Sequence, residues 1–477
     1  MTIRRYIASK DTTITNALLE NLVNRATGSN MGQSDVLEVF SIYGQSGSNS
    51  QELSRVLVQF PVDTIVSDRQ QARIPPSGSV KFVLKLSNTV HPFTLPKDYH
   101  LVVNALSRSW AEGHGMDMEQ YKDQEACNWI SSSLGQAWDT EGGDIVSGYE
   151  YKQYLDEGTE DLELDVTQLV EDWIDGTQPN YGVMIKLSSS YEDDTRSYYT
   201  KKFFARGSQY FYKKPWLEVR YDATVKDDRG NFYNYNPFVP AEQSQHTLYF
   251  YNRFKGQLYD HPVVGQGNIY VKLYPTVGIP TNDTIPLTLL GGDTVVTGSW
   301  VSTGIYSASL GINTNLTTVY DFWFTQPNDA TSIIGYGGPL KILSPFEEEN
   351  FTKDNYVVSV KNLKAKYSNE ENARVQIFVR PSNWNPNSYT SVVKAPTPYI
   401  IEDMYYNVFR IADGLDVIPY GTGSMNHTRL SFDKNGNYFD LDMSLLEPGY
   451  SYGIKFKIFD TNEYYENREV FKFRVED

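Results

Sequence analysis

Cysteine, histidine and long apolar runs are all scarce in this chain of 477 residues. Its single cysteine, Cys127, excludes an intrachain disulfide and a zinc site built from several thiolates. No stretch approaches the ~20 consecutive apolar residues that span a bilayer, so we expect no membrane partner. The residues after Met1 are mostly polar where a secretory signal would be apolar, which predicts folding in a reducing cytoplasm.

Positive charge is also in short supply. Lysine and arginine together number 42 against 59 aspartates and glutamates, which leaves a formal net charge of −17. A field of that sign repels phosphate backbones, and we therefore expect no nucleic acid partner. Apolar residues make up 40% of the chain, which is enough to build sizeable cores. The composition therefore predicts a globular protein of several domains.

The sequence contains no motif of a known catalytic or nucleotide-binding site. The histidines show neither the HExxH pattern nor the i, i+4 spacing of a zinc-binding helix. Cys127 has no candidate base close by in sequence, no Gly-x-Ser-x-Gly motif occurs, and the glycine-rich residues 264–267 lack the lysine of a phosphate site. We therefore expect no catalytic residue, no cofactor-binding residue and no enzymatic activity. The six histidines, each expected on a loop or sheet edge, are His91, His100, His114, His246, His261 and His427.

Two acidic runs are candidates for metal binding or for acid–base chemistry, namely residues 157–161 and residues 192–194. Carboxylates coordinate Ca²⁺ readily, and a pair of them can hydrolyse a glycosidic bond. In so acidic a chain, however, such runs are more often solvated loops. Metal ligands therefore stay unassigned, and calcium binding within residues 1–222 is left as an open hypothesis.

Short apolar runs with a period of two dominate the chain and predict an all-β protein. The clearest of these runs are residues 54–60, 80–86, 216–221, 268–274, 374–380 and 452–458. Helical periodicity is confined to two short segments, residues 16–24 and 166–174.

Turn-rich and charged stretches divide the chain into three predicted domains, residues 1–222, 223–345 and 346–477. The last begins near the acidic run at residues 347–349. The second and third have the size of immunoglobulin-like β-sandwiches of about seven strands. Residues 445–452 lead into a strand and resemble the corner of fibronectin-type domains, where a tyrosine hydroxyl caps the loop.

Tyrosine is unusually frequent, with 36 residues against 8 methionines. Adjacent aromatic residues could stack on sugar rings or line a protein interface, or they could simply alternate between core and solvent along a strand. The alternation is the simpler interpretation for any single cluster, but their number favours an extensive interface. The clusters are residues 198–199, 210–212, 249–251, 405–406 and 464–465.

Residues 1–222 contain an ordered series of short motifs. In chain order these are D-T-x-I at 11–14, N-x-G at 30–32, an R-x-L strand at 55–60, C-N-W at 127–129, W with G-G-D at 138–144, D-V-T-x-x-V-x-x-W at 165–173 and N-Y-G at 180–182. The series resembles the DNRLRE family, a β-sandwich module related in architecture to carbohydrate-binding modules. This chain departs from the family pattern at 55–60, which is one residue longer, and at 127–129, where Thr-Trp-Asn is expected. No ligand site is carried over.

The resemblance is consistent with the physical character of these residues. Val166, Leu169 and Trp173 fall on one face of a short helix, which can close one end of a sandwich. Asn180 and Gly182 suit a turn into the next strand. The same reasoning makes Trp110, Trp129 and Trp138 core or loop-anchoring residues rather than sugar platforms.

The whole chain also resembles structural proteins of tailed bacteriophages, notably those of marine bacteria, through residues 3–9, 197–206 and 301–306. This resemblance implies a virion protein of the head, neck, tail or baseplate, which assembles in the host cytoplasm with itself and other virion proteins. The alternative is a carbohydrate-binding adhesin or receptor-binding component of a virion or cell surface, with a glycan as partner. A polysaccharide-degrading enzyme ranks last.

Overall fold

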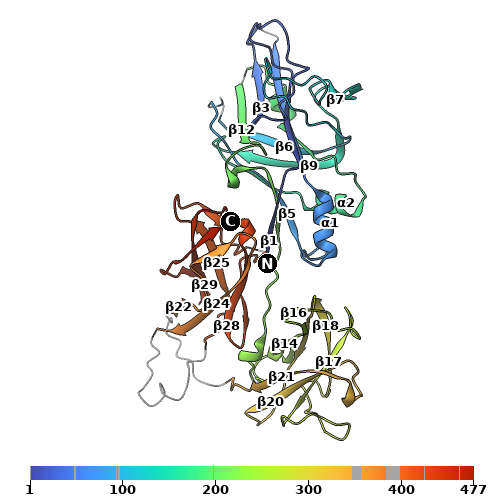
Figure 1. Ribbon diagram of the computed structural model, residues 1–477, viewed down its shortest axis with the longest axis vertical. Coiled ribbons are helices and arrows are strands. Elements are labelled where there is room, and N and C mark those ends of the chain that lie inside the picture. The colour runs from blue at the N-terminus through green and yellow to red at the C-terminus, as the bar shows by residue number, and fades with distance from the viewer. Residues whose placement is uncertain are drawn as a thin grey trace. The chain divides into compact units, whose positions relative to one another are not determined.

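The computed structural model describes residues 2–477, except residues 48–49, 93, 95–96, 197, 346–355, 383–397, 424 and 461. Strands account for 43% of the chain and helices for 9%, so the protein is all-β, as the alternating runs predict. The chain forms two compact units, residues 2–222 and residues 223–477 (Figure 1). The acidic run at 347–349, near which a third domain was predicted to begin, lies outside the described residues.

The first unit is a sandwich of two antiparallel sheets. The smaller sheet has the order β1 (Ile3–Ile7), β13 (Trp216–Arg220), β5 (Lys81–Leu86) and β10 (Leu162–Asp165). The larger sheet has the order β12 (Tyr198–Phe204), β3 (Val36–Tyr43), β4 (Gln51–Gln59), β11 (Val183–Leu187), β6 (Tyr99–Leu106) and β9 (Ile145–Leu155), with β2 (Lys10–Thr15) paired to β4. Alternate side chains from both sheets, such as Leu84 and Val103, meet in one core.

A second, smaller core lies on the outer face of the larger sheet. Residues 107–144 include only the short hairpin β7 (Ser131–Ser133) and β8 (Gln136–Ala137). Trp110, Trp129 and Trp138 from this segment are buried together with Leu57 and Met184 of the sheet. The prediction that these tryptophans anchor loops or core is confirmed. Both faces of the sheet are therefore covered by apolar side chains.

Of the two predicted helices in the first unit, one is confirmed and one is wrong. Residues 166–174 correspond to α2 (Thr167–Asp175), which buries Leu169 and Trp173 as predicted. Residues 16–24 instead form turns, because the Asn21 side chain accepts the Val23 and Asn24 N–H groups that a helix would use internally. Glu52 accepts the Leu18 amide and holds the start of this segment. The sequence pattern also missed α1 (Val62–Gln70), whose β-branched residues favour strands. A one-turn helix, α3 (Ser189–Glu192), and a 3₁₀ turn, η1 (Phe211–Lys213), complete the unit.

The first half of the second unit is a six-stranded sheet that bends back on itself. Its order is β14 (His246–Tyr251), β19 (Ile305–Leu310), β18 (Val296–Ser302), β17 (Ile269–Tyr274), β20 (Thr318–Phe324) and β21 (Ile333–Lys341). The first half of β18 pairs with β17 and its second half with β19, so β18 passes from one layer to the other. Leu248 of β14 and Trp323 of β20 consequently share a core.

The second half of the second unit contains two further sheets. One has the order β22 (Tyr356–Val360), β24 (Asn372–Pro381), β28 (Gly436–Asp442) and β27 (Ser431–Asp433). The other has the order β23 (Lys366–Ser368), β31 (Phe471–Glu476), β29 (Ser451–Asp460), β25 (Met404–Arg410) and β26 (Asp416–Ile418), with β30 (Glu463–Glu466) paired to β29. The sheets pack through stacked rings of Tyr406 and Phe439, whose centroids are 4.1 Å apart. The Tyr452 hydroxyl donates to the Glu447 carbonyl at 2.7 Å, so a tyrosine caps this corner as predicted.

One extended segment, residues 225–234, is bound to both halves of the second unit. Val225 and Asp227 exchange backbone hydrogen bonds with Phe432, and Asn234 donates to the Leu343 carbonyl. Between these contacts lie the 3₁₀ turn η2 (Asp228–Gly230) and the guanidinium of Arg229. The other 3₁₀ turns of this unit are η3 (Ala241–Ser244), η4 (Ala330–Ser332) and η5 (Met443–Leu445).

Arg229 forms a buried, two-pronged ion pair with Asp321 of β20. The Nη1–Oδ1 and Nη2–Oδ2 distances are 2.7 and 2.8 Å, and both side chains are almost fully shielded from solvent. The Trp323 indole also donates to Asp321 at 2.8 Å. Charge pairing and hydrogen bonding together satisfy a carboxylate that would otherwise be costly to bury.

Replacing Asp321 by Asn should destabilise the second unit by about 3–5 kcal/mol, because the buried Arg229 charge loses its counter-ion. The matched control is Asp440→Asn. Arg374 also contacts Asp440 through two nitrogens, but that pair is solvent-exposed and should contribute less than about 1 kcal/mol. Urea denaturation followed by amide hydrogen exchange in residues 318–341 measures both effects. Equal losses in the two variants would contradict the prediction.

Candidate binding site

The residues singled out for metal binding do not converge. Among the described residues, no group of three or more His, Cys, Asp and Glu side chains is placed to hold a metal ion. His246 accepts a hydrogen bond from the Tyr233 amide, and burial lowers its pKa. Cys127 is fully buried, which raises the pKa of its thiol and keeps it protonated. His246 and Cys127 therefore occupy structural positions within the fold.

The acidic run at residues 157–161 surrounds a cation that belongs to the chain itself. The Nζ of Lys201 on β12 donates to the carbonyl oxygens of Gly158 and Glu160 at 3.0 and 2.5 Å, and to the Oδ1 of Asn88 at 2.8 Å. Lys201 is 0% exposed. Burial lowers the pKa of this ammonium to about 8, although Glu160 and Asp161 oppose the shift. The three N–H groups of the ammonium thus each have an oxygen acceptor. Because these oxygens already bind Lys201, they are not free to coordinate a metal ion.

The second acidic run is partly internal as well. Glu192 is buried and forms a two-pronged ion pair with Arg55 of β4, at 3.0 and 2.8 Å. The Arg55 guanidinium in turn lies 5.1 Å from the ring centroid of Trp129. Glu192 therefore helps to hold residues 107–144 on the larger sheet, and it is unavailable for acid–base chemistry with a ligand.

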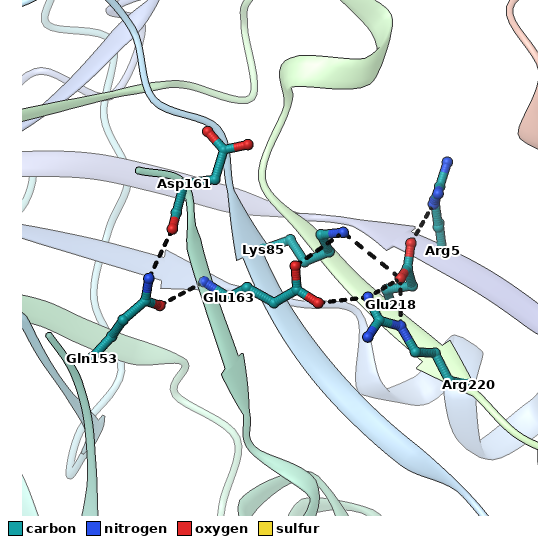
Figure 2. Close-up of polar contacts among 7 residues, drawn as sticks. All are labelled: Arg5, Lys85, Gln153, Asp161, Glu163, Glu218 and Arg220. Carbon is teal, nitrogen blue, oxygen red and sulfur yellow. Dashed lines mark hydrogen bonds and ion pairs between the residues drawn. The ribbon is translucent and has the colours of Figure 1, made fainter. Parts of the chain in front are cut away.

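A charged network crosses the outer face of the smaller sheet (Figure 2). Glu218 of β13 is buried and contacts Arg5 of β1 at 2.7 Å and Arg220 at 2.7 Å. Lys85 of β5 lies 3.9 Å from the same carboxylate. Burial alone would raise the pKa of Glu218, but the three positive charges outweigh burial and lower it to about 2. This network ties neighbouring strands together.

The network extends to the edge of the sandwich through Gln153 of β9. Its Nε2 donates to the Asp161 carbonyl at 2.9 Å, and its Oε1 accepts from the Glu163 amide of β10 at 2.8 Å (Figure 2). Glu163 also accepts from Arg220 at 2.7 Å. One glutamine side chain therefore joins an edge strand of the larger sheet to an edge strand of the smaller sheet.

The adjacent aromatic residues follow strand alternation in one case and depart from it in another. Tyr199 is buried in the first core, whereas its neighbour Tyr198 is 36% exposed, as alternation predicts. Tyr405 and Tyr406 of β25 are both buried. Tyr406 faces the other sheet, and Tyr405 packs against Tyr464 of β30 on the opposite side. Alternation was the wrong interpretation for residues 405–406, because β25 is covered on both faces.

A further aromatic cluster lies on the face of β17, β20 and β21 opposite the core, and no predicted cluster contains it. Cross-strand pairing aligns its side chains in three rows. The rows are Tyr270, Phe324 and Ile333; Lys272, Phe322 and Tyr336; and Tyr274, Tyr320 and Pro339. Tyr274, Phe322 and Phe324 are buried, whereas Tyr336 is 42% exposed.

A pocket of about 790 Å³ opens beside this aromatic face. Its walls are the loop at residues 279–283, the η4 turn with the start of β21, and Phe322 and Tyr336. The loop is held in place because Asn282 Oδ1 accepts the Ala330 amide at 2.9 Å. The Phe322 and Tyr336 rings lie 5.0 Å apart, so the pocket has an aromatic floor. Such a volume falls in the usual range of small-ligand sites.

Polar groups line the same pocket. Asn282, Asp283 and Thr331 are all exposed, and the Thr331 hydroxyl donates to Asp329 but can still accept. Asp283 is the only charged residue among those lining the pocket, all of which the structure describes. An aromatic floor with hydrogen-bonding groups around its rim can bind a ligand that has both apolar and hydroxyl-bearing faces.

Comparisons with known proteins leave the family open. No known family matches the sequence, and no curated protein is similar to it. The solved structures with a weak likeness to this chain include two that cover most of it. A DUF4785 family protein from Legionella pneumophila is 11% identical, with 92% of this chain and 90% of that chain covered and a TM-score of 0.13. Trypsin-activated alpha-2-macroglobulin from Escherichia coli is 7% identical, with 92% and 30% covered and a TM-score of 0.17.

Both TM-scores are too low to carry an argument about fold or function. Within the part of the chain that the structure describes, no helix has the length and apolar character needed to cross a bilayer.

Replacing Lys201 by Met should destabilise the first unit by about 2–5 kcal/mol, because three buried or partly buried oxygens each lose a charged donor. The wild-type melting temperature should be the same with calcium and with a chelator. Thermal unfolding followed by circular dichroism tests both statements. Lys202→Met is the matched control, since the neighbouring Lys202 makes a partly exposed ion pair with Glu38. A chelator-induced fall in the wild-type melting temperature would show that calcium is bound.

The Glu218 network should make the stability of the first unit sensitive to acid. Because its folded pKa of about 2 lies below the ordinary 4.5, Glu218 contributes about 3 kcal/mol above pH 4.5. That contribution is lost as the pH falls from 4.5 to about 2. The stability difference between wild type and Glu218→Gln should therefore shrink over this window in urea denaturation. The exposed Glu157→Gln variant should show a small difference throughout.

Proposed function

We propose that this chain is a non-catalytic structural protein of a tailed-phage particle, which acts through interfaces with itself and with other virion proteins. The proposal is supported by the resemblance of the chain to phage structural proteins. It is supported further by one feature of the second unit, a small hairpin that presents aromatic side chains to solvent.

The hairpin consists of β15 (Arg253–Phe254) and β16 (Gln257–Leu258) and pairs with no other strand among the described residues. Lys255 and Gly256 join the two strands with positive φ angles of 51° and 83°, as a tight type I′ turn requires. The Asn252 amide donates to the Gly304 carbonyl at 2.8 Å, so the base of the hairpin is fixed to the turn between β18 and β19.

Large apolar side chains gather on and beside this hairpin. Phe254 is 63% exposed and Tyr259 is 59% exposed, and their ring centroids lie 6.4 Å apart. Val263, four residues after Tyr259 in the sequence, is 75% exposed. Aromatic side chains are enriched at protein–protein interfaces. In a symmetric particle they would be buried in an interface of the obligate size class, above about 2,000 Å².

A carbohydrate-binding adhesin, on a virion or a cell surface, is the second candidate function. The observation that favours it is the aromatic-floored pocket beside β20 and β21. The two functions are compatible, because a fibre or baseplate protein can be both a building block and the part that contacts the host.

The Phe254→Asp variant should lose self-association and incorporation into particles, because a carboxylate would be desolvated in the interface. Its melting temperature should stay unchanged, since Phe254 is outside the core. Light scattering coupled to size exclusion measures assembly, and mass spectrometry of purified particles measures incorporation. Val90→Asp is the control, because Val90 is 93% exposed on the first unit. A wild-type chain that stays monomeric and is missing from particles would overturn the proposal.

A further inference from the structure

The geometry points to the pocket beside β20 and β21 as a binding site for a neutral oligosaccharide, one of whose sugar rings stacks on Tyr336. This inference rests on the second candidate function, carbohydrate binding, and adds to it the site and the chemical class of the ligand.

The first argument is the shape of the aromatic floor. Tyr336 is 42% exposed, while its cross-strand neighbour Phe322 is 3% exposed. Their interplanar angle is 31° and their centroids are 5.0 Å apart, so the buried ring supports the exposed one. The Tyr320 ring lies 6.4 Å away at 28°, which extends the surface along the sheet. A supported, partly exposed ring offers an apolar face to the C–H groups of a pyranose without itself needing to move.

The second argument is the placement of the polar groups. A sugar ring carries hydroxyls around its edge, and these need donors and acceptors at the rim of the platform. Asn282 accepts the Ala330 amide through its Oδ1 and is exposed, so its side-chain NH₂ group is available as a donor. The Asp283 carboxylate, also on this loop, is exposed at the rim as an acceptor. The pocket therefore has both a hydrogen-bond donor and an acceptor for sugar hydroxyls.

The third argument concerns the charge of the ligand. Asp283 is the only charged side chain in the pocket lining, and the chain carries a net charge of −17. An anionic sugar such as a uronic acid, or a phosphate group, would be repelled by this carboxylate without a compensating cation. A neutral sugar avoids the repulsion and makes full use of Asp283 as an acceptor.

The fourth argument is the fixed structure of the loop. Thr281 and Thr284 hydrogen-bond to each other through backbone and hydroxyl groups at 2.9–3.2 Å. Asp329 caps the facing η4 turn by accepting from the Thr331 amide at 2.8 Å. Both walls of the pocket are thus formed before a ligand arrives, which lowers the entropic cost of binding.

The test is calorimetric titration of the full chain with neutral oligosaccharides of glucose, galactose, mannose and xylose. We expect wild type to bind at least one of them. Tyr336→Ala should weaken that binding about tenfold, which corresponds to the stacking contribution of one ring. Asn282→Asp should also weaken it, because this change keeps the acceptor for Ala330 and removes the donor. Tyr210→Ala replaces a similarly exposed tyrosine of the first unit and should have no effect.

Each alternative outcome is informative. If wild type binds and Tyr336→Ala binds equally well, the site is wrong while carbohydrate binding stands. If wild type binds none of the sugars, the inference of a neutral-oligosaccharide site in this pocket is overturned. If Tyr336→Ala instead abolishes self-association, the aromatic face is covered by a second copy of the chain, and the inference fails. Melting temperatures of all variants should match wild type, which separates loss of binding from loss of folding.

Discussion

The Arg229–Asp321 ion pair determines how the second unit is arranged around β20. A charge so deeply buried tolerates only one partner at one position, and Asp321 must therefore point toward the segment at residues 225–234. Because side chains alternate along a strand, Val319 and Trp323 point to the same side and form the core. Tyr320 and Phe322 are then forced onto the opposite face. A slip of one residue would turn Tyr320 and Phe322 toward the core of Val319 and Trp323 and turn Asp321 away from Arg229. The ion pair and the aromatic face thus both follow from the same register of β20.

Internal charge pairing recurs across the first unit, where it uses much of the limited supply of basic residues. Lys201 satisfies loop carbonyls, Arg55 holds Glu192, and Arg5 and Arg220 flank Glu218. In each case a cation neutralises polar or acidic groups that the fold has removed from water. The net negative charge of the chain is therefore largely a property of its surface, where it favours solubility at high concentration.

Most of the fold could be predicted from the two-residue periodicity of strands. Each of the six clearest alternating runs lies within or across a strand, as at β4 and β29. The α2 helix was equally predictable, since Leu169 and Trp173 share a face. The α1 helix was missed because tertiary packing against α2, including the Arg69–Glu171 ion pair, overrides its β-branched composition. At residues 16–24 the error is the opposite one, since a helix was predicted and turns form. There a side-chain oxygen accepts backbone N–H groups that a helix would need.

The binding pocket was harder to foresee, because its walls come from segments about fifty residues apart that only the sheet brings together. One local signal was present. Residues 320–324 combine apolar residues at both phases of the two-residue period, which indicates a strand covered on both faces. No comparable signal connects Lys201 with the carbonyls of Gly158 and Glu160.

The covalent attachment of the Lys201 amine to the chain has a consequence of its own. A diffusible ion leaves its site when the medium is diluted or chelated, whereas the tethered Lys201 side chain stays in place and changes only its protonation, around a pKa of about 8.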